Sequence, residues 1–198
     1  MTAMTPLQTL QAAIQAGDDE AAEAAVLALS PADAPALITW LQAADADQRW
    51  WAARGLAHCG GDDVTAALGA RLTDEDPAVR GAVIFSLGAL HSRHPHAVRP
   101  LLPTLAALLA DPDGRVRQVA ADALARCGDD ALPALAAVLA GEAQGARTRA
   151  AYTLHKIRSP QSAPLLFRYL NDPNYMVHTY VHEALDSLGL LENVLLLP

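Results

Sequence analysis

Three columns of leucine and one column of arginine recur along this chain about every thirty-one residues. The anchors of the repeat are Arg49, Arg80, Arg117, Arg147 and His178. A leucine stands seven positions after each anchor, and two more stand eight and twelve positions before it. These leucines are Leu56, Leu87, Leu124, Leu154, Leu185; Leu41, Leu72, Leu109, Leu139, Leu170; and Leu37, Leu68, Leu105, Leu135, Leu166. A fixed period of this length predicts an all-α solenoid, in which each repeat buries its apolar face against its neighbours.

Each repeat is predicted to be a pair of helices. Proline stands fourteen positions before the anchor in four repeats (Pro35, Pro103, Pro133, Pro164), where it suits the first turn of a helix. Aspartate-rich turns such as 74–77 follow and are expected to cap the second helix. In the second helix, positions −1, +3, +6, +7 and +10 from the anchor form one apolar stripe, which predicts its buried face.

The columns predict six helical pairs, at residues 5–29, 31–58, 61–91, 97–127, 129–157 and 160–188. Residues 1–30 keep the helical periodicity but lose most columns, so they are expected to form a degenerate capping repeat. Residues 31–189 are expected to form five repeats, and residues 190–198 a capping tail.

The segment from Asp111 to Leu124 resembles the second helix of the HEAT-like repeat family, which often carries the label of phycobilisome-lyase HEAT-like repeats. The resemblance covers about residues 31–189 and implies a solenoid of helical hairpins. It does not imply one activity, because similar repeats occur in scaffolds, lyase subunits, a metal hydroxylase and DNA-repair proteins.

Composition narrows the possible partners. A net charge of −8 disfavours nucleic acid and anionic membranes. Residues 1–15 contain no basic residue, so we expect no signal peptide, and the apolar stretch 101–110 is too short to span a bilayer. Cys59 and Cys127 occupy the same place in two repeats and are interpreted as small buried side chains of a cytoplasmic protein.

We expect no catalytic residues, no metal and no cofactor. His91, His94 and His96 could ligate a transition metal, but their short segment is equally interpretable as a solvated connector. The His-Glu dipeptide of this chain resembles those of the deoxyhypusine hydroxylases, in which His-Glu pairs from several repeats hold iron. This chain has one such pair, His182 and Glu183, at a different repeat position.

The arginine column could bind anions, but a structural role is the stronger interpretation. Asp45, Asp76 and Asp113 each stand four residues before an arginine and are expected to be its local charge partners. The resemblance implies that such pairs form a ladder between repeats.

Positions +1, +5 and +8 of the second helices lie opposite the buried stripe and are expected to be exposed. This stripe carries the candidate partner-binding residues Trp50, Arg54, Phe85, Tyr152 and His155. Aromatic and arginine side chains contribute much of the energy of protein interfaces, so we expect these five to share one concave binding face. The alternative is that Trp50 folds down over the capping repeat.

The sequence therefore favours a non-catalytic scaffold that binds another protein through its concave face. A subunit of a bilin lyase-isomerase or another lyase complex is the alternative that the family resemblance implies. A DNA-binding protein is a second alternative, although the exposed stripe mixes Arg54, Arg126 and Lys156 with acidic residues.

Protein purified without an affinity tag is expected to contain no stoichiometric iron or zinc, because no set of His-Glu pairs recurs at equivalent repeat positions. Elemental analysis tests this. One equivalent of either metal would contradict it and would direct attention to His91, His94 and His96.

Overall fold

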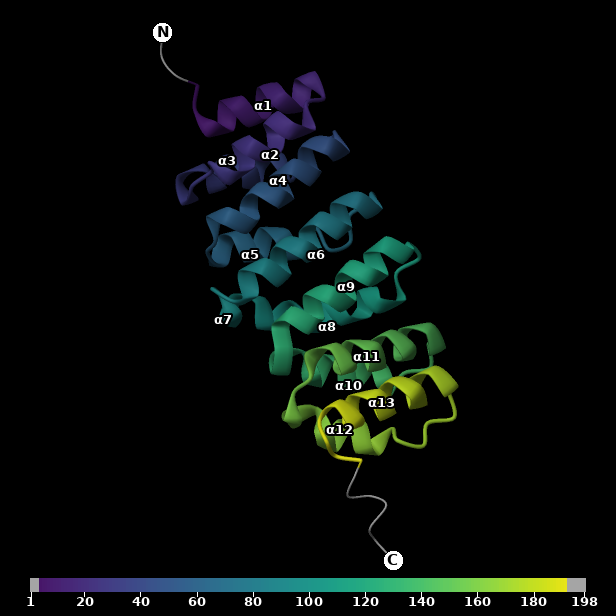
Figure 1. Cartoon of the computed structure of the whole chain (residues 1–198). Helices are drawn as coiled ribbons and strands as arrows, with labels where there is room; N and C mark the ends of the chain where they lie inside the picture. Colours follow the sequence, from purple (N-terminus) through teal and green to yellow (C-terminus); the bar gives the residue numbers. More distant parts are fainter. Residues whose placement is uncertain (1–3, 192–198) are drawn as a thin grey trace, which may run out of the picture. The chain divides into compact units, whose positions relative to one another are not determined.

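The computed structural model describes residues 4–191, and every regular element in them is a helix (Figure 1). Its contacts divide the chain into two compact units, Met1–Val98 and Arg99–Pro198, referred to below as unit 1 and unit 2. The predicted all-α solenoid of helical hairpins is confirmed. The division into a cap, five repeats and a tail stays a prediction, and residues 192–198 of that tail lie outside the described residues.

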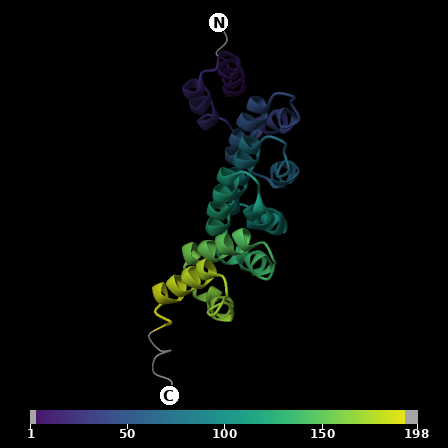
Figure 2. The same cartoon turned by 90° about the vertical axis from the view of Figure 1, so that its right-hand side faces the viewer.

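Unit 1 is built from helices that pair along the chain, followed by one short helix. Their bounds are α1 Pro6–Ala16, α2 Asp19–Leu27, α3 Ala34–Trp40, α4 Ala46–Cys59, α5 Asp62–Gly69, α6 Pro77–His91 and α7 Pro95–Val98. The second helix of each pair packs on the next second helix, so that α4 lies between α2 and α6, while α3 contacts α5 (Figures 1 and 2).

Unit 2 repeats this arrangement. Its helices are α8 Leu102–Ala107, α9 Gly114–Cys127, α10 Leu132–Leu139, α11 Gln144–Ile157, α12 Ala163–Arg168 and α13 Tyr175–Ser187. Helix α11 lies between α9 and α13, and α8 packs on α10 (Figure 1). Short 3₁₀ turns lead into the first helices at Pro31–Asp33, Arg99–Leu101, Gly128–Ala131 and Pro160–Ser162, and another, Leu108–Ala110, follows α8.

All six residue ranges predicted to hold helical pairs contain two main helices. The interval between Arg80 and Arg117 is 37 residues, six longer than the usual repeat, and the surplus falls at the end of α6 and in α7. There the Arg93 guanidinium donates to the carbonyl oxygen of Ala57, and the His94 ring lies against Gly60, where an added Cβ would meet its Nε2 at 2.7 Å. Arg93 and His94 therefore contact the C-terminal end of α4, while Ser92, Arg93 and His96 remain exposed to solvent.

The leucine columns form the core of each unit. Every leucine of the −12 and +7 columns is at most 1% exposed. The −8 column is buried as well, except that Leu170 is half-buried. The small residues of the +6 column are all buried, and the Ser86 hydroxyl donates to the carbonyl oxygen of Ala53 on the neighbouring α4 at 2.7 Å. This contact shows how closely adjacent second helices approach.

Side chains cap the second helices as the aspartate-rich turns predicted. Asp76 accepts hydrogen bonds from the backbone N–H groups of Ala78 and Val79 at 2.7 and 3.3 Å. Asp45, Asp113 and Asn174 cap α4, α9 and α13 in the same way. The two N–H bonds at Asp113 lower the pKa of its carboxyl group. The capping carboxylates thus satisfy N–H groups that the helix itself leaves unpaired.

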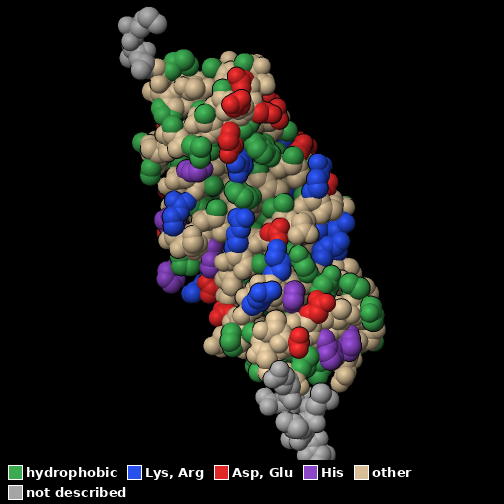
Figure 3. All heavy atoms as spheres, in the orientation of Figure 1, with side chains coloured by type: hydrophobic (Ala, Val, Ile, Leu, Met, Phe, Trp, Pro, Cys, Tyr) green, Lys and Arg blue, Asp and Glu red, His purple; other side chains and the backbone are tan. Residues whose placement is uncertain are grey.

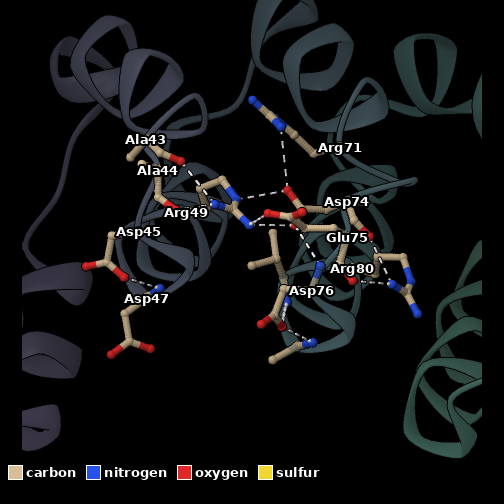
Figure 4. Close-up of polar contacts among 12 residues, drawn as sticks. Ala43, Ala44, Asp45, Asp47, Arg49, Arg71, Asp74, Glu75, Asp76 and Arg80 are labelled. Carbon is tan, nitrogen blue, oxygen red and sulfur yellow. Dashed lines mark hydrogen bonds and ion pairs between the residues drawn. The ribbon is translucent and has the colours of Figure 1, made fainter.

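The prediction that the aspartate four positions earlier pairs with each anchor arginine is wrong for Arg49. The Arg49 guanidinium instead makes two 2.9 Å hydrogen bonds with the carboxylate of Asp74, twenty-five residues later in the next pair (Figure 4). Its third nitrogen donates to the carbonyl oxygens of Ala43 and Ala44 at the end of the preceding turn. Arg49 therefore ties two successive helical pairs together, as the ladder implied by the family resemblance requires.

Other anchors share parts of this pattern. Arg80 donates to the carbonyl oxygens of Asp74 and Glu75, and Arg117 to those of Asp111 and Pro112. Arg147 pairs with Asp172, again twenty-five residues later. The arginine column is thus mainly structural, because each side chain bonds the turn that precedes its own helix or reaches the following repeat.

The partners of Asp74 offset the effect of burial on the ionisation of its carboxyl group. Burial alone would raise the pKa of its carboxyl group, but hydrogen bonds from Arg49 and the Asp76 N–H, and the charges of Arg49 and Arg71, lower that pKa overall. The pKa of Arg49 is raised, chiefly by its hydrogen bond to Asp74. Both groups are therefore ionised inside unit 1.

No single helix in residues 4–191 is long and apolar enough to cross a membrane. Within the described residues, one pair of helices, Asp19–Leu27 and Pro31–Trp40, bent by 114°, meets those criteria of length and composition when taken together.

Replacing Leu124 by alanine is expected to lower the free energy of unfolding by about 2–5 kcal/mol, because Leu124 is fully buried between helices and its truncation leaves a cavity. Leu27→Ala is the matched control, since Leu27 is 67% exposed and its loss creates no cavity. Chemical denaturation of both variants tests this. Equal midpoints for the two variants would show that the leucine register is wrong.

Replacing Asp74 by asparagine is expected to lower the free energy of unfolding by about 3–5 kcal/mol, because it leaves the Arg49 charge buried without its partner. Glu75→Gln is the control. Glu75 lies 3.6 Å from the same guanidinium, but its side chain is 88% exposed, so its loss should have little effect. An equal loss in both variants would contradict a bridging role for Asp74.

The same variant should alter the acid sensitivity of folding. Because the folded state lowers the pKa of Asp74, the stabilisation from this carboxylate is complete above its ordinary pKa of about 3.9. It is lost as the pH falls through the lower pKa of the folded state. The difference in unfolding free energy between wild type and Asp74→Asn should therefore shrink on acidification, which denaturation at a series of pH values measures. A constant difference would contradict this.

Candidate protein-binding site

The five predicted partner-binding residues fall into two groups, one in each unit. Trp50, Arg54 and Phe85 belong to unit 1, and Tyr152 and His155 belong to unit 2. All five side chains are half-buried. That they share one concave face stays a prediction.

The group in unit 1 is centred on Arg54. One helical turn separates Trp50 from Arg54 on α4, and α6 supplies Phe85 from the neighbouring pair. The guanidinium carbon of Arg54 lies 4.8 Å from the centre of the Phe85 ring and 5.7 Å from the Trp50 ring. Its Nη2 forms a 2.6 Å ion pair with Glu23 of α2. Three successive second helices therefore contribute to one cluster of aromatic and charged side chains.

Trp50 borders an open depression of about 470 Å³ beside this cluster. The depression is lined by Asp19, Glu23, Asp47, Trp50, Trp51 and Ala78. The rings of Trp50 and Trp51 meet edge to face, with centroids 4.7 Å apart and planes at 85°. Trp51 is only 6% exposed and fills the core, whereas Trp50 is half-buried next to α2 of the predicted cap. Trp50 thus keeps part of its surface accessible.

Negative charge is concentrated in unit 1. Residues 1–98 contain twelve Asp and Glu residues against five Arg residues, a net charge of −7 out of −8 for the chain. The first forty-eight residues contain seven acidic residues and no Lys, Arg or His. On the face drawn in Figure 3, acidic side chains gather at the N-terminal end of unit 1. The aromatic cluster therefore lies in a negative electrostatic environment.

The group in unit 2 is arranged differently. The rings of Tyr152 and Tyr180 meet at 61° with centroids 5.3 Å apart, and the His155 ring lies 6.5 Å from Tyr180. Lys156 forms an ion pair with Asp122 of the neighbouring α9, and its Nζ lies 5.6 Å from the Tyr152 ring. The unit 2 group is therefore also an aromatic cluster bordered by a charge pair.

The pKa of Asp122 reflects this pairing. Its partial burial acts to raise the pKa, but hydrogen bonds from Lys156 and Gln118 and the nearby positive charges lower it overall. The pKa of Lys156 is raised, mainly by its hydrogen bond to Asp122. The two side chains thus carry opposite charges on the surface.

Part of the predicted exposed stripe is in the core. Ala57 and Gly88 at position +8 are buried, so the prediction that the whole +8 column is exposed is wrong for these two repeats. The close approach of α4 and α6 covers these small side chains. The accessible stripe of unit 1 is therefore narrower than the helical pattern predicted.

Sequence reasoning also missed several residues of the two clusters. Asp19, Glu23, Asp47 and Trp51 line the depression, and Tyr180 completes the group in unit 2. The acidic residues 18–20 could have indicated an acidic surface in this region, but residues 1–30 were interpreted only as a capping repeat. Tyr180 stands two positions after the anchor His178, outside the +1, +5 and +8 stripe that was expected to be exposed.

The described residues offer little for nucleophilic or metal chemistry. Burial raises the pKa of the Cys59 thiol to about 11 and that of Cys127 to about 12, so both stay protonated and weakly nucleophilic. Residues 4–191 contain no group of three or more His, Cys, Asp and Glu side chains placed to hold a metal ion.

Stacked helical pairs with a surface of this kind define a helical-repeat protein. Residues 34–106 and 102–189 match the family described as HEAT repeats. The matched segments cover most of the chain, which therefore belongs to the HEAT repeat family. The comparison with curated proteins gives no match.

Solved structures show the same architecture. An engineered protein is 23% identical with a TM-score of 0.53, over 95% of this chain and 93% of that chain. The complex of CpcE and CpcF of phycocyanin lyase from Nostoc sp. PCC7120 is 26% identical with a TM-score of 0.53, over 78% of this chain. The match spans 64% of that chain's length. The first similarity shows the fold alone, and the second adds a lyase subunit to the structural relatives.

Proposed function

We propose that this protein is a non-catalytic HEAT-repeat scaffold that binds another protein through the exposed stripe of its second helices. The observation that carries the proposal is the cluster of Trp50 and Arg54 on α4 with Phe85 on α6, which an ion pair from Arg54 to Glu23 links to α2. We expect a cytoplasmic location, in keeping with two free, buried cysteines.

The composition of the cluster supports binding to a protein. Tryptophan, tyrosine and arginine are enriched among the side chains that contribute most to interface energy. The ion pair with Glu23 and the contact with Phe85 hold the Arg54 side chain in place before a partner arrives, so less side-chain freedom is lost on binding. A partly ordered aromatic surface of this kind suits a protein interface better than a small-molecule reaction site.

The group of Tyr152, His155 and Tyr180 is proposed as a second contact region. His155 Nδ1 is buried and has no hydrogen-bond partner within the described residues. The two regions could then contribute separately to the binding of one partner.

A subunit of a lyase complex is the second candidate function. The observation that favours it is the 26% identity to the CpcE–CpcF complex of phycocyanin lyase. In that role the chain would hold a chromophore or its apoprotein without supplying a nucleophile. A change in absorbance on mixing the protein with a free bilin would favour this candidate.

Replacing Trp50 by alanine is expected to weaken binding to the partner by at least about 2 kcal/mol, because a large accessible indole is lost from the proposed interface. Its effect on folding should be smaller, because Trp51 and not Trp50 fills the core. Partners captured from the native host with tagged protein, then purified, allow the affinity and the melting temperature to be measured.

Trp40→Ala is the matched control, since Trp40 is a half-buried tryptophan of α3 that lies outside the cluster. It should leave the affinity for the partner unchanged. If Trp50→Ala instead lowers the melting temperature strongly and leaves affinity intact, Trp50 seals the cap and the proposed interface is wrong.

A further inference from the structure

The depression beside Trp50 combines two indole rings with three carboxylates from two helices. Asp19 and Glu23 come from α2, and Asp47 comes from α4 together with Trp50 and Trp51. Its volume of about 470 Å³ falls within the range of about 300–1,000 Å³ that is typical of ligand sites. All of its lining residues belong to unit 1.

Two of the three carboxylates lack a cationic partner. Glu23 is paired with Arg54, but no Lys, Arg or His within residues 4–191 forms an ion pair with Asp19 or Asp47. Both aspartates lie in the first turn of a helix, where a carboxylate also stabilises the helix end. That role does not require two tryptophans beside them, so the combination calls for a separate explanation.

The indole rings favour an organic cation over a metal ion. The described part of the chain contains no cluster of carboxylates close enough to hold a metal. Tryptophan faces attract cations through the ring quadrupole, and a neighbouring carboxylate adds hydrogen bonds and charge. Arg54 already shows this chemistry within the protein, because it lies over the rings of Trp50 and Phe85 while it pairs with Glu23.

We propose that this depression, called the acidic tryptophan pocket below, binds an arginine side chain in a basic segment of the protein partner. The inference rests on the proposed protein-binding function and names the chemistry of that partner. Among the biological cations, a guanidinium fits best, because it is planar, stacks on aromatic rings and donates several hydrogen bonds in a fork that matches a carboxylate. Asp19 and Asp47 supply the acceptors, and Trp50 supplies the ring face.

The charge of unit 1 supports a basic partner segment. With a net charge of −7 over residues 1–98, the long-range field around the pocket attracts cations and repels nucleic acids and anionic membranes. Glu23 pairs with Arg54, so the positive charge of Arg54 beside the pocket is offset by a carboxylate.

Tryptophan fluorescence provides a direct test. The chain has three tryptophans, and a Trp40→Phe background leaves only the two that line the pocket. A nine-residue peptide with three arginines is titrated at low ionic strength, together with counterparts in which lysine or citrulline replaces arginine. We expect the arginine peptide to quench the fluorescence saturably. The lysine peptide should bind more weakly, and the citrulline peptide should not bind. Added salt should weaken the binding.

Two charge variants locate the binding site. Asp47→Asn should lower the affinity for the arginine peptide about tenfold, because it removes a charge-assisted hydrogen-bond acceptor from the pocket. Asp63→Asn is the matched control, since Asp63 also lies in the first turn of a helix of unit 1 and lines a different depression. It should change the affinity less than about twofold, the size of a general charge effect. Trp50→Leu should abolish the quenching that depends on arginine.

Each outcome bears on one hypothesis. Equal binding of the arginine and citrulline peptides, or equal effects of Asp47→Asn and Asp63→Asn, would overturn the arginine pocket. Because Asp47→Asn barely changes side-chain size, the test does not depend on whether Trp50→Leu folds. A captured partner that binds through Trp50 while no arginine peptide binds would retain the proposed function and refute the pocket alone.

Discussion

Each helical pair of this protein can bury its leucine stripe only against a neighbouring pair, and the rest of the structure depends on that constraint. The +6 column is limited to small side chains because a larger one would separate adjacent second helices. The Ser86 hydroxyl bond to the Ala53 carbonyl shows the resulting closeness of α4 and α6. Ion pairs such as Arg49–Asp74 can then join successive pairs, since their backbones approach within reach of one side chain.

The close packing of second helices also determines where a binding surface can form. It covers Ala57 and Gly88 and leaves larger residues at the +1 and +5 positions as the accessible ones. In unit 1 these include Trp50, Arg54 and Phe85, each from a helix that the leucine core already holds in place. A surface built on packed helices keeps its side chains in order before a partner binds, which lowers the entropic cost of association.

Charge would add selectivity to the proposed binding surface. The N-terminal pairs carry almost all of the net negative charge, and the acidic tryptophan pocket lies among them. Aromatic residues alone would favour many apolar partners. The carboxylates of Asp19 and Asp47, which have no cationic partner in the part of the chain that the structure describes, disfavour partners that are anionic or purely apolar. Unit 2 differs, because its ion pair of Lys156 and Asp122 neutralises both charges beside Tyr152. The two units therefore present surfaces of different character on the same repeat framework.

Repeat length, helix pairing and the buried leucine columns could be predicted from the sequence, because a periodic pattern expresses contacts that recur in every repeat. The caps Asp76 and Asp113 were predictable for the same reason, since they act within a few residues of their own helix. The pairing of Arg49 with Asp74 and the pocket formed by Asp19, Asp47 and Trp50 were not. These contacts join side chains from different repeats, and only the packing of one helix on the next brings such residues together.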